Sequence, residues 1–456
     1  MRENSILLAF YGDDFTGSTD AMEALALSGN RTLLFLEPPS ASMLERFEGI
    51  RCIGVAGTSR AKTPSDMAKE IGPVMSRLSE LQAPIVHYKT CSTFDSSPEV
   101  GSIGEAIRIS RPFFPEQSTV PLLVGAPALG RYTLFGQHFA RMNDEVYRLD
   151  RHPVMSRHPV TPMHEADLRL HLEAQLGEKV ELMNIVELEG DYDHVVERYK
   201  GKLKDKPSVL LLDVLDEARM TLSGRLIWEA AEEGDRFVVG SSGVEYALSA
   251  YWKEQGMAAS GGEGLISAPV KAADRILVVS GSASSVSQRQ IENALAEGFH
   301  GIRISPEQLA QRDCMPEELL NEAISLLDRG ESVVLYTALG PDDEAIVEAR
   351  ERIRDNGIES SQAGELIGRQ LGRWTRHIML KAKLRRVVIA GGDTSGFVTS
   401  EMGIYGMEML MSISPGAPLC RVYSHNDSMD GVELALKGGQ FGSPDYFAKV
   451  RDAAMN

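Results

Sequence analysis

The chain alternates between short apolar runs and longer segments in which apolar residues recur every three or four positions. The runs, rich in Val, Ile and Leu, lie at residues 5–11, 32–36, 52–55, 85–88, 120–124, 209–212, 237–239, 276–279, 332–336 and 387–390. Short continuous apolar runs separated by amphipathic helical segments are typical of buried parallel strands. The pattern therefore predicts an α/β fold with a mostly parallel sheet flanked by helices in each half of the chain.

One segment interrupts this alternation. Residues 256–273 read GMAASGGEGLISAPVKAA, which is rich in small residues and nearly uncharged. Such a composition is typical of a linker between domains. We therefore expect a first domain at 1–255, a linker at 256–273 and a second domain at 274–456, each of an ordinary domain size.

Charge and composition narrow the function classes. The 456 residues include 65 Asp and Glu against 47 Lys and Arg, a net charge of −18. This balance disfavours nucleic acid or an anionic membrane as the main partner, because such partners need a basic face. No apolar run approaches the about 18 residues of a membrane span, and the N-terminal run is too short for a signal peptide. Four cysteines without CxxC spacing indicate a reducing, cytoplasmic location and no zinc site of the usual kind.

Ligands of parallel sheets bind beyond the carboxyl ends of strands, so the residues after each apolar run are candidates. After the first run the chain reads GDDFTG, which places Asp13 and Asp14 side by side. Two adjacent carboxylates repel a phosphate, but they suit hydroxyl binding, general-base chemistry or Mg²⁺. Because Asp is common in turns and helix caps, a purely structural role for both residues is the alternative.

The run at 276–279 is followed by Gly281 and by several serines that open a predicted helix. Backbone N–H groups at a helix N-terminus, with serine hydroxyls, suit an anionic ligand. A simple serine cap is the alternative.

The run at 387–390 is followed by a second glycine-rich loop. Gly391 and Gly392 allow a ligand to approach the backbone closely, and Asp393 and Thr394 offer oxygens for Mg²⁺ or phosphate. The loop lacks the GK[ST] of a P-loop and the GxGxxG of a dinucleotide fold, so neither of those sites is indicated.

Five motifs, in order along the chain, resemble those of the four-carbon acid sugar kinase family. They are GDDFTGSTD from residue 12, GSSG from 240, VVSGSASSVSQRQI from 278, AGGDTSG from 390 and LKGGQFG from 436. The resemblance spans almost the whole chain. It implies an N-terminal domain that binds an acid sugar, a C-terminal domain that binds a nucleotide, and ATP-dependent phosphorylation of a hydroxyl on a small sugar acid.

The resemblance also implies roles for individual residues. The ATP contacts it implies are Ser282, Gly391, Gly392, Asp393, Thr394 and Gly439. It places Asp13 and Asp14 in the substrate site. Phosphoryl transfer needs a positioned proton acceptor and neutralisation of phosphate charge. We therefore expect Asp14, or else Asp13, to orient or deprotonate the acceptor hydroxyl, and Asp393 to hold Mg²⁺ directly or through water.

One loop departs from the family pattern, which reads K-x-D-S-T-L-R-G. From Lys89 this chain reads KTCSTFDS, so Lys89, Ser92 and Thr93 are kept while Cys91 and Asp95 replace the Asp and the Arg. An Asp cannot bind a substrate carboxylate as an Arg fork does. We therefore expect an acceptor other than threonate or erythronate. The loop is similar to that of a branch of the family that acts on 3-oxo-isoapionate.

Lys89 is the residue that we expect to bind the substrate carboxylate. The further polar residues expected on the substrate side are Ser92, Thr93, Asp95, Arg131, Arg157 and His158. The alternatives are a kinase for threonate, erythronate or 3-oxo-tetronate, a non-catalytic sensor of a sugar acid or nucleotide, and a hydrolase or isomerase on the same scaffold. A homodimer is expected on general grounds, because most soluble oligomers are symmetric dimers.

Overall fold

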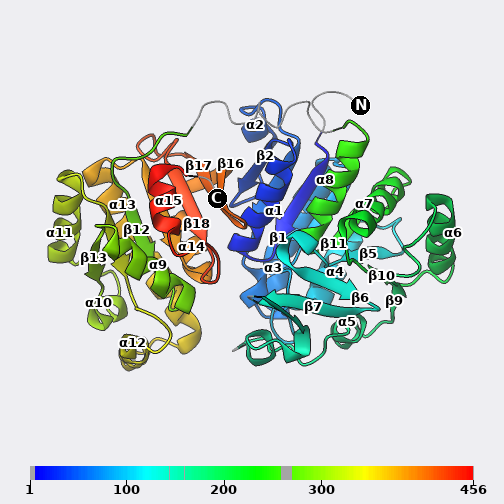
Figure 1. Cartoon of the computed structure of the whole chain (residues 1–456), viewed down its shortest axis with the longest axis horizontal. Coiled ribbons are helices and arrows are strands. Elements are labelled where there is room, and N and C mark those ends of the chain that lie inside the picture. The colour runs from blue at the N-terminus through cyan, green and yellow to red at the C-terminus, as the bar shows by residue number, and fades with distance from the viewer. Residues whose placement is uncertain (1–5, 143, 159, 258–269, 455–456) are drawn as a thin grey trace. The chain divides into compact units, whose positions relative to one another are not determined.

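The computed structural model describes residues 6–142, 144–158, 160–257 and 270–454, with the side chains of residues 360, 361 and 393 excepted. The chain divides into two compact units, Met1–Leu265 and Ile266–Asn456, which are described separately (Figure 1). Of the segment predicted as a linker, residues 258–269 lie outside the described residues.

The first unit is built on a parallel sheet. Its strands, in spatial order, are β2 (Thr32–Phe35), β3 (Cys52–Ala56), β1 (Leu8–Gly12), β4 (Ile85–Lys89), β11 (Phe237–Gly240), β5 (Val120–Leu123), β10 (Val209–Leu212) and β9 (Val180–Met183). Every neighbouring pair in this series is parallel. All their carboxyl ends therefore lie at one edge, where the loops that follow them gather.

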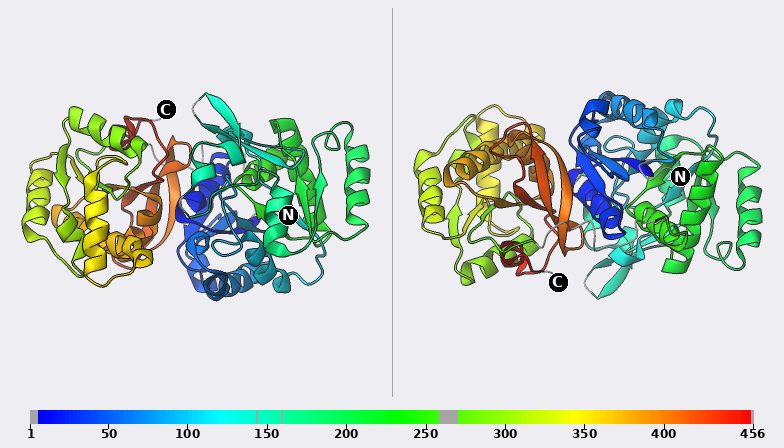
Figure 2. Two further views of the ribbon diagram at one scale, coloured as in Figure 1. Left: turned by 90° about the horizontal axis from the view of Figure 1, so that it is seen from below. Right: turned by 90° about the horizontal axis from the view of Figure 1, so that it is seen from above.

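Helices cover both faces of this sheet (Figures 1 and 2). They are α1 (Phe15–Leu27), α2 (Ala41–Leu44), α3 (Pro64–Glu80), α4 (Ile103–Ser110), α5 (Leu168–Leu176), α6 (Tyr192–Leu203), α7 (Glu217–Glu232) and α8 (Gly243–Glu254), with short 3₁₀ turns η1 (Ser59–Ala61), η2 (Arg111–Phe113), η3 (Pro127–Leu129), η4 (Leu149–Arg151) and η5 (Met155–Arg157). Ala9 and Tyr11 of β1 pack in one core with α3, α4 and α5. Because side chains alternate along a strand, Leu8 and Phe10, which are also fully buried, face the opposite side. Burial on both faces explains why these strands read as continuous apolar runs.

A small antiparallel sheet follows β5. It consists of β6 (Arg131–Leu134), β7 (Gln137–Met142) and β8 (Glu145–Arg148). The turn between β6 and β7 has positive φ at Phe135 (52°) and Gly136 (79°), as two-residue hairpin turns require.

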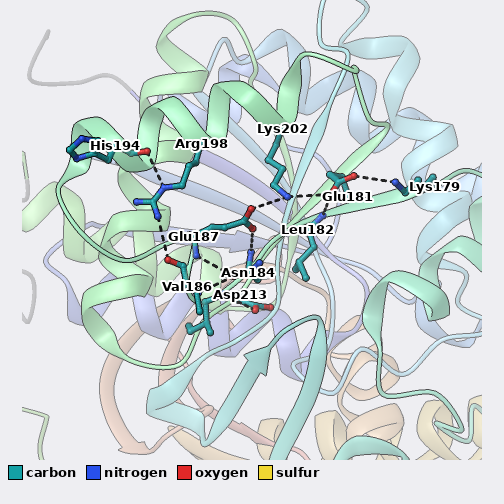
Figure 3. A network of polar contacts seen from close by, with 11 residues as sticks. Lys179, Glu181, Leu182, Asn184, Val186, Glu187, His194, Arg198, Lys202 and Asp213 are labelled. Atoms are coloured by element: carbon teal, nitrogen blue, oxygen red, sulfur yellow. Dashed lines mark hydrogen bonds and ion pairs between the residues drawn. The ribbon is translucent and has the colours of Figure 1, made fainter.

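Asp213, directly after β10, holds that turn on the main sheet. Its carboxylate accepts hydrogen bonds from the backbone N–H groups of Phe135 (2.5 Å), Gly136 (3.0 Å) and Ile185 (3.0 Å). Figure 3 shows Asp213 beside the turn that contains Asn184. Burial raises the pKa of Asp213 to about 6, although the three backbone donors favour the anion. The hairpin is thereby fixed at the carboxyl edge of the sheet.

The second unit contains a mixed sheet. Its strands, in spatial order, are β13 (His300–Arg303), β14 (Val333–Tyr336), β12 (Leu277–Ser280), β15 (Arg386–Ala390), β18 (Glu433–Lys437), β17 (Ala417–Ser424) and β16 (Ile404–Ser414). The first five are parallel, and β17 and β16 are antiparallel. The helices are α9 (Ser285–Ala296), α10 (Pro306–Ala310), α11 (Glu317–Asp328), α12 (Glu344–Asp355), α13 (Ser360–Ala382), α14 (Gly392–Glu401) and α15 (Tyr446–Asp452).

The predicted fold class, two α/β domains with mostly parallel sheets, is confirmed. The apolar runs did not reveal the antiparallel strands β6–β8, β16 and β17. Buried and partly exposed residues are mixed along β7 and β16, and β8 has no buried residue, so these strands do not have the apolar runs of strands buried on both faces. Among the described residues, no helix has both the length and the hydrophobicity needed to cross a bilayer.

Candidate functional site

In the first unit, polar residues gather where β1 and β4 end. The two strands are neighbours with Gly12 paired to Lys89, and the Asp13 backbone N–H donates to the Lys89 carbonyl at 2.9 Å. A Cβ atom built on Gly17 would lie 2.0 Å from Lys89 Nζ and 2.3 Å from Asp14 Oδ1. The glycine in the first turn of α1 therefore leaves the space that the Lys89 amine occupies beside Asp14.

Asp14 is the N-cap of α1, and its carboxylate is fully engaged. Oδ1 accepts from the Gly17 N–H at 3.0 Å, while Oδ2 accepts from Thr16 Oγ1 at 2.8 Å and pairs with Arg60 Nη2 at 2.8 Å. Burial raises the pKa of Asp14, but the Arg60 and Lys89 cations and these hydrogen bonds outweigh burial and hold the pKa below its ordinary value. Asp14 is therefore a fixed anion.

Asp13 differs from its neighbour. It is 2 % exposed, and among the described residues its Oδ1 has no hydrogen-bond partner. Burial and the charge of Asp14 raise the pKa of Asp13 to about 7, against the opposing effect of Arg60 and Lys89. A buried carboxyl group with a free oxygen and a pKa near neutrality can take up a proton at physiological pH.

Arg60 joins this cluster from η1, after β3. Its backbone N–H donates to the Asp13 carbonyl at 3.0 Å, and its guanidinium pairs with Asp14. Burial lowers the pKa of Arg60, but the charges of the neighbouring groups outweigh burial and raise the pKa above its ordinary value. These groups are Asp14, Cys91, Asp95 and Asp13. No sequence motif singled out Arg60. Its position shortly after the apolar run at 52–55 was the available signal.

The loop that begins at Lys89 borders the same cluster. The Lys89 side chain is buried, and although burial lowers its pKa, the Asp14, Asp20 and Asp13 charges outweigh burial and keep the ammonium charged. Thr93 Oγ1 donates to Asp95 Oδ1 at 2.6 Å and lies 3.1 Å from Cys91 Sγ.

Cys91 itself is not a reactive thiolate. Burial and the nearby Asp95 charge raise the pKa of its thiol to about 12. The adjacent Ser92 is held through its carbonyl oxygen, which lies 2.9 Å from His138 Nε2.

The remaining predicted residues on the substrate side differ in their surroundings. Arg131, at the start of β6, donates to the Leu129 carbonyl at 3.0 Å, and its buried Nε has no partner within the described part of the chain. Burial lowers the pKa of Arg131, while Cys91 and Asp20 counteract burial.

Arg157 and His158 occupy the η5 region. Arg157 is exposed, and His158 Nδ1 accepts from the Thr161 backbone N–H at 3.1 Å. Within the described ranges, no hydrogen bond or ion pair joins either residue to Asp13, Asp14 or Lys89.

In the second unit, three glycine-containing loops meet at the carboxyl ends of β12, β15 and β18. The Gly281 N–H donates to the Ala390 carbonyl at 3.0 Å, and the Gly391 N–H donates to the Lys437 carbonyl at 2.9 Å. A Cβ atom on Gly281 would lie 2.4 Å from Thr394 Oγ1, and one on Gly439 would lie 2.9 Å from Ser282 Oγ. A Cβ atom at either position would force the hydroxyl group that it meets to move, so glycine lets these loops approach closely.

Two helix N-termini open at these loops. Gly391, at φ 140°, caps α14, and Ser284 caps α9 by accepting the Ser287 N–H at 3.0 Å. The Ser284 hydroxyl also donates to the Gly439 carbonyl. Free N–H groups at helix N-termini bind anions such as phosphate.

Of the predicted nucleotide residues, the structure brings together the loops that carry Ser282, Gly391, Gly392, Thr394 and Gly439. Asp393 lies in the first turn of α14, and its side chain is outside what the structure describes. The described residues contain no group of three or more His, Cys, Asp or Glu side chains that could hold a metal ion.

Two family models match the two units. Residues 8–248 match a sugar-binding N-terminal domain, and residues 277–447 match a nucleotide-binding C-terminal domain.

Curated relatives align over nearly the full chain. A 3-oxo-isoapionate kinase of Paraburkholderia graminis is 44% identical, with 99% of this chain and 95% of the relative aligned. A 3-oxo-tetronate kinase of Pseudomonas savastanoi pv. phaseolicola is 29% identical, with 97% and 96% aligned.

Solved structures share the fold. A Haemophilus influenzae protein has a TM-score of 0.71 at 23% identity, covering 97% of this chain and 99% of its own. A Salmonella typhimurium protein has a TM-score of 0.74 at 23% identity, covering 98% of both chains.

Proposed function

The chain belongs to the four-carbon acid sugar kinase family and is a sugar-acid kinase, and on this premise we propose that it phosphorylates a branched 3-oxo sugar acid with ATP. The preferred acceptor is 3-oxo-isoapionate. The 44% identity to a kinase named for that acid supports this choice, against 29% for a relative named for 3-oxo-tetronate. The replacement of the family's loop arginine by Asp95 supports it as well.

The unequal pair of carboxylates is the observation that carries the proposed chemistry. Asp13 has a free buried oxygen and a pKa near 7, whereas both oxygens of Asp14 are engaged with Thr16, Gly17 and Arg60. The sequence favoured Asp14 as the base, and this geometry favours Asp13.

In the proposed reaction, proton transfer and phosphoryl transfer occur in one concerted step. The acceptor hydroxyl gives its proton to Asp13 Oδ1 while its oxygen forms a bond to the γ-phosphorus of ATP. The bond between that phosphorus and the bridging oxygen breaks, and ADP leaves with the electron pair. Asp14, as a fixed anion, orients Arg60 and Lys89 and takes no proton.

Two cations are available for the substrate carboxylate. The Lys89 ammonium is buried beside Asp14, and Arg60 is 27 % exposed with one guanidinium nitrogen paired to Asp14. A guanidinium has five N–H donors, so Arg60 keeps donors for a second carboxylate. Arg60 thereby replaces the arginine that the family carries in the Lys89 loop. Arg131 is a third cation, with a buried Nε that lacks a partner in the described structure.

The nucleotide loops of the second unit suit a phosphate chain and fit Mg²⁺. The Thr394 hydroxyl lies against Gly281 and Gly391, and Asp393 precedes it at the start of α14. Hydroxyl and carboxylate oxygens are the donors that Mg²⁺ prefers. Bound there with ATP, the ion would neutralise charge that develops on the phosphates.

Release of ADP tests this function. We would incubate the protein with Mg²⁺, ATP and one acid at a time: 3-oxo-isoapionate, 3-oxo-tetronate, threonate or erythronate. The proposal expects the highest kcat/KM with 3-oxo-isoapionate. A higher value with an unbranched acid would refute the assigned acceptor and leave the kinase. ATP binding without ADP release would indicate a sensor, and turnover of an acid without ATP would indicate a hydrolase or isomerase.

We also propose that the protein acts in the cytoplasm and as a homodimer. Its acidic charge and scattered thiols favour the first, and the general frequency of symmetric dimers favours the second. Light scattering coupled to gel filtration would reveal a monomer and so refute the dimer.

A further inference from the structure

Lys437 is a buried lysine at the carboxyl end of the second sheet. It is the last residue of β18, its carbonyl accepts from the Gly391 N–H at 2.9 Å, and Gly439 follows two positions later. Its side chain is 0 % exposed. Lys437 has no role in the phosphoryl-transfer step proposed for Asp13, and it was not among the predicted nucleotide residues.

The Lys437 ammonium is poorly compensated. Nζ donates to Ser287 Oγ at 3.1 Å, although an ammonium group has three donors. No carboxylate of the described side chains lies within ion-pair distance of Nζ, and burial is the sole cause that lowers the pKa of Lys437, to about 7. A buried charge without a counter-ion is unfavourable until an anion arrives.

The other charged side chains on the neighbouring elements are directed elsewhere. Arg386 of β15 pairs with Glu433, and Glu401 of α14 pairs with Arg369. Arg289 and Glu292 of α9 are exposed. The side chain of Asp393 is outside the described residues.

Ser287 connects Lys437 to the nucleotide loops. It lies in the first turn of α9, with its Oγ 3.1 Å from the Oγ of the cap residue Ser284 and 3.5 Å from the Gly439 carbonyl oxygen. Lys437 is therefore placed behind the helix N-terminus that suits a phosphate. The three loops, residues 281–287, 391–396 and 438–442, contain no Lys or Arg of their own.

We propose that Lys437 is a further nucleotide-binding residue, whose ammonium neutralises a phosphate of ATP at the N-terminus of α9. The proposal rests on the assignment of these loops to ATP. A phosphate there gains a fixed cation from β18 in addition to the N–H groups of α9. The cation gains the counter-ion that the described residues do not supply.

ATP affinity in the absence of any sugar acid tests the proposal. We would compare the wild type with Lys437→Met and Lys437→Arg by calorimetry, with Lys381→Met, an exposed lysine on α13, as the matched control. Lys437→Met should weaken ATP binding about tenfold to a hundredfold, the range for a lost charged hydrogen bond. In turnover its KM for ATP should rise while its KM for the sugar acid stays unchanged. Lys437→Arg should recover most of the affinity.

A structural role alone would give a different result. Lys437→Met would then unfold at a lower temperature but bind ATP as the wild type does, which would overturn the proposal. Should Lys437→Met fail to fold, proton uptake by the wild-type protein on ATP binding tests the proposal instead. Because burial lowers the pKa of Lys437 to about 7, its amine is mostly neutral in the free protein at pH 8. A phosphate that binds the ammonium form should therefore make ATP binding take up close to one proton, measured by calorimetry in buffers of different ionisation enthalpy. No proton uptake would overturn the proposal.

The assay also separates this proposal from the proposed function. ATP binding that depends on Lys437, without ADP release on any acid, would refute the kinase assignment and support the role of Lys437. A wild type that binds no ATP would refute both.

Discussion

Replacing Asp13 by Asn tests the central assignment, because it should lower activity and raise stability together. Asn keeps the shape of the side chain but cannot accept a proton as a base. A general base typically contributes about 10²- to 10⁴-fold to the rate, so kcat should fall by that factor. The Kd for ATP, whose loops lie in the other unit, should not change.

The stability change follows from the raised pKa of Asp13. A rise from 3.8 to about 7 corresponds to about 4 kcal/mol of unfavourable free energy when the buried carboxylate is ionised. This cost is absent below pH about 4, grows as the pH rises toward the folded-state pKa, and is constant above it. Asp13→Asn should therefore unfold at a higher temperature than the wild type at pH 8, and at nearly the same temperature at pH 4.

Asp14→Asn is the matched control, with the opposite expectation. Its carboxylate is anionic and engaged with Arg60, Thr16 and Gly17, so its loss should destabilise the fold by about 1–3 kcal/mol.

The pH dependence of wild-type activity gives a second test of the role of Asp13. In the wild type, kcat/KM should fall about tenfold per pH unit below pH 7, as Asp13 becomes protonated. An Asp13→Asn protein within threefold of wild-type activity, or one that unfolds at a lower temperature at pH 8, would refute the reasoning.

Three further substitutions follow from the geometry. Gly17→Ala places a Cβ 2.0 Å from Lys89 Nζ, so the KM for the sugar acid should rise at least tenfold, whereas Gly201→Ala on α6, which has open space, should change nothing. Gly439→Ala places a Cβ 2.9 Å from Ser282 Oγ, so the KM for ATP should rise while the KM for the acid does not; Gly364→Ala on α13 is its control. Asp213→Ala leaves three backbone donors without an acceptor, at a cost of about 1–3 kcal/mol each, so thermal unfolding should occur at a clearly lower temperature. Equal KM values for the two glycine variants and their controls, or an unchanged unfolding temperature for Asp213→Ala, would contradict these assignments.

Local sequence determined much of the fold because burial on both sheet faces leaves a local signature. The runs at 5–11, 85–88 and 387–390 correspond to β1, β4 and β15, and each is followed by a loop of the candidate site. The family motifs add the order of the two units, which the family models match. The fold class was therefore predictable from the residues alone, and the same runs place the loops of the proposed site at the carboxyl ends of the strands.

The division of labour within those loops was decided by tertiary contacts. Asp13 and Asp14 are the same residue type in the same turn. They differ because Arg60, which arrives from the end of β3, pairs with one and leaves an oxygen of the other unpartnered. Lys437 ends its strand as many surface lysines do, and only the tertiary structure, which brings Ser287 of α9 to its Nζ, makes it a buried amine. Charge, burial and pKa depend on groups that are distant in sequence, so the sequence pointed to the loops of the proposed site, whereas the differences between the residues within those loops come from the tertiary structure.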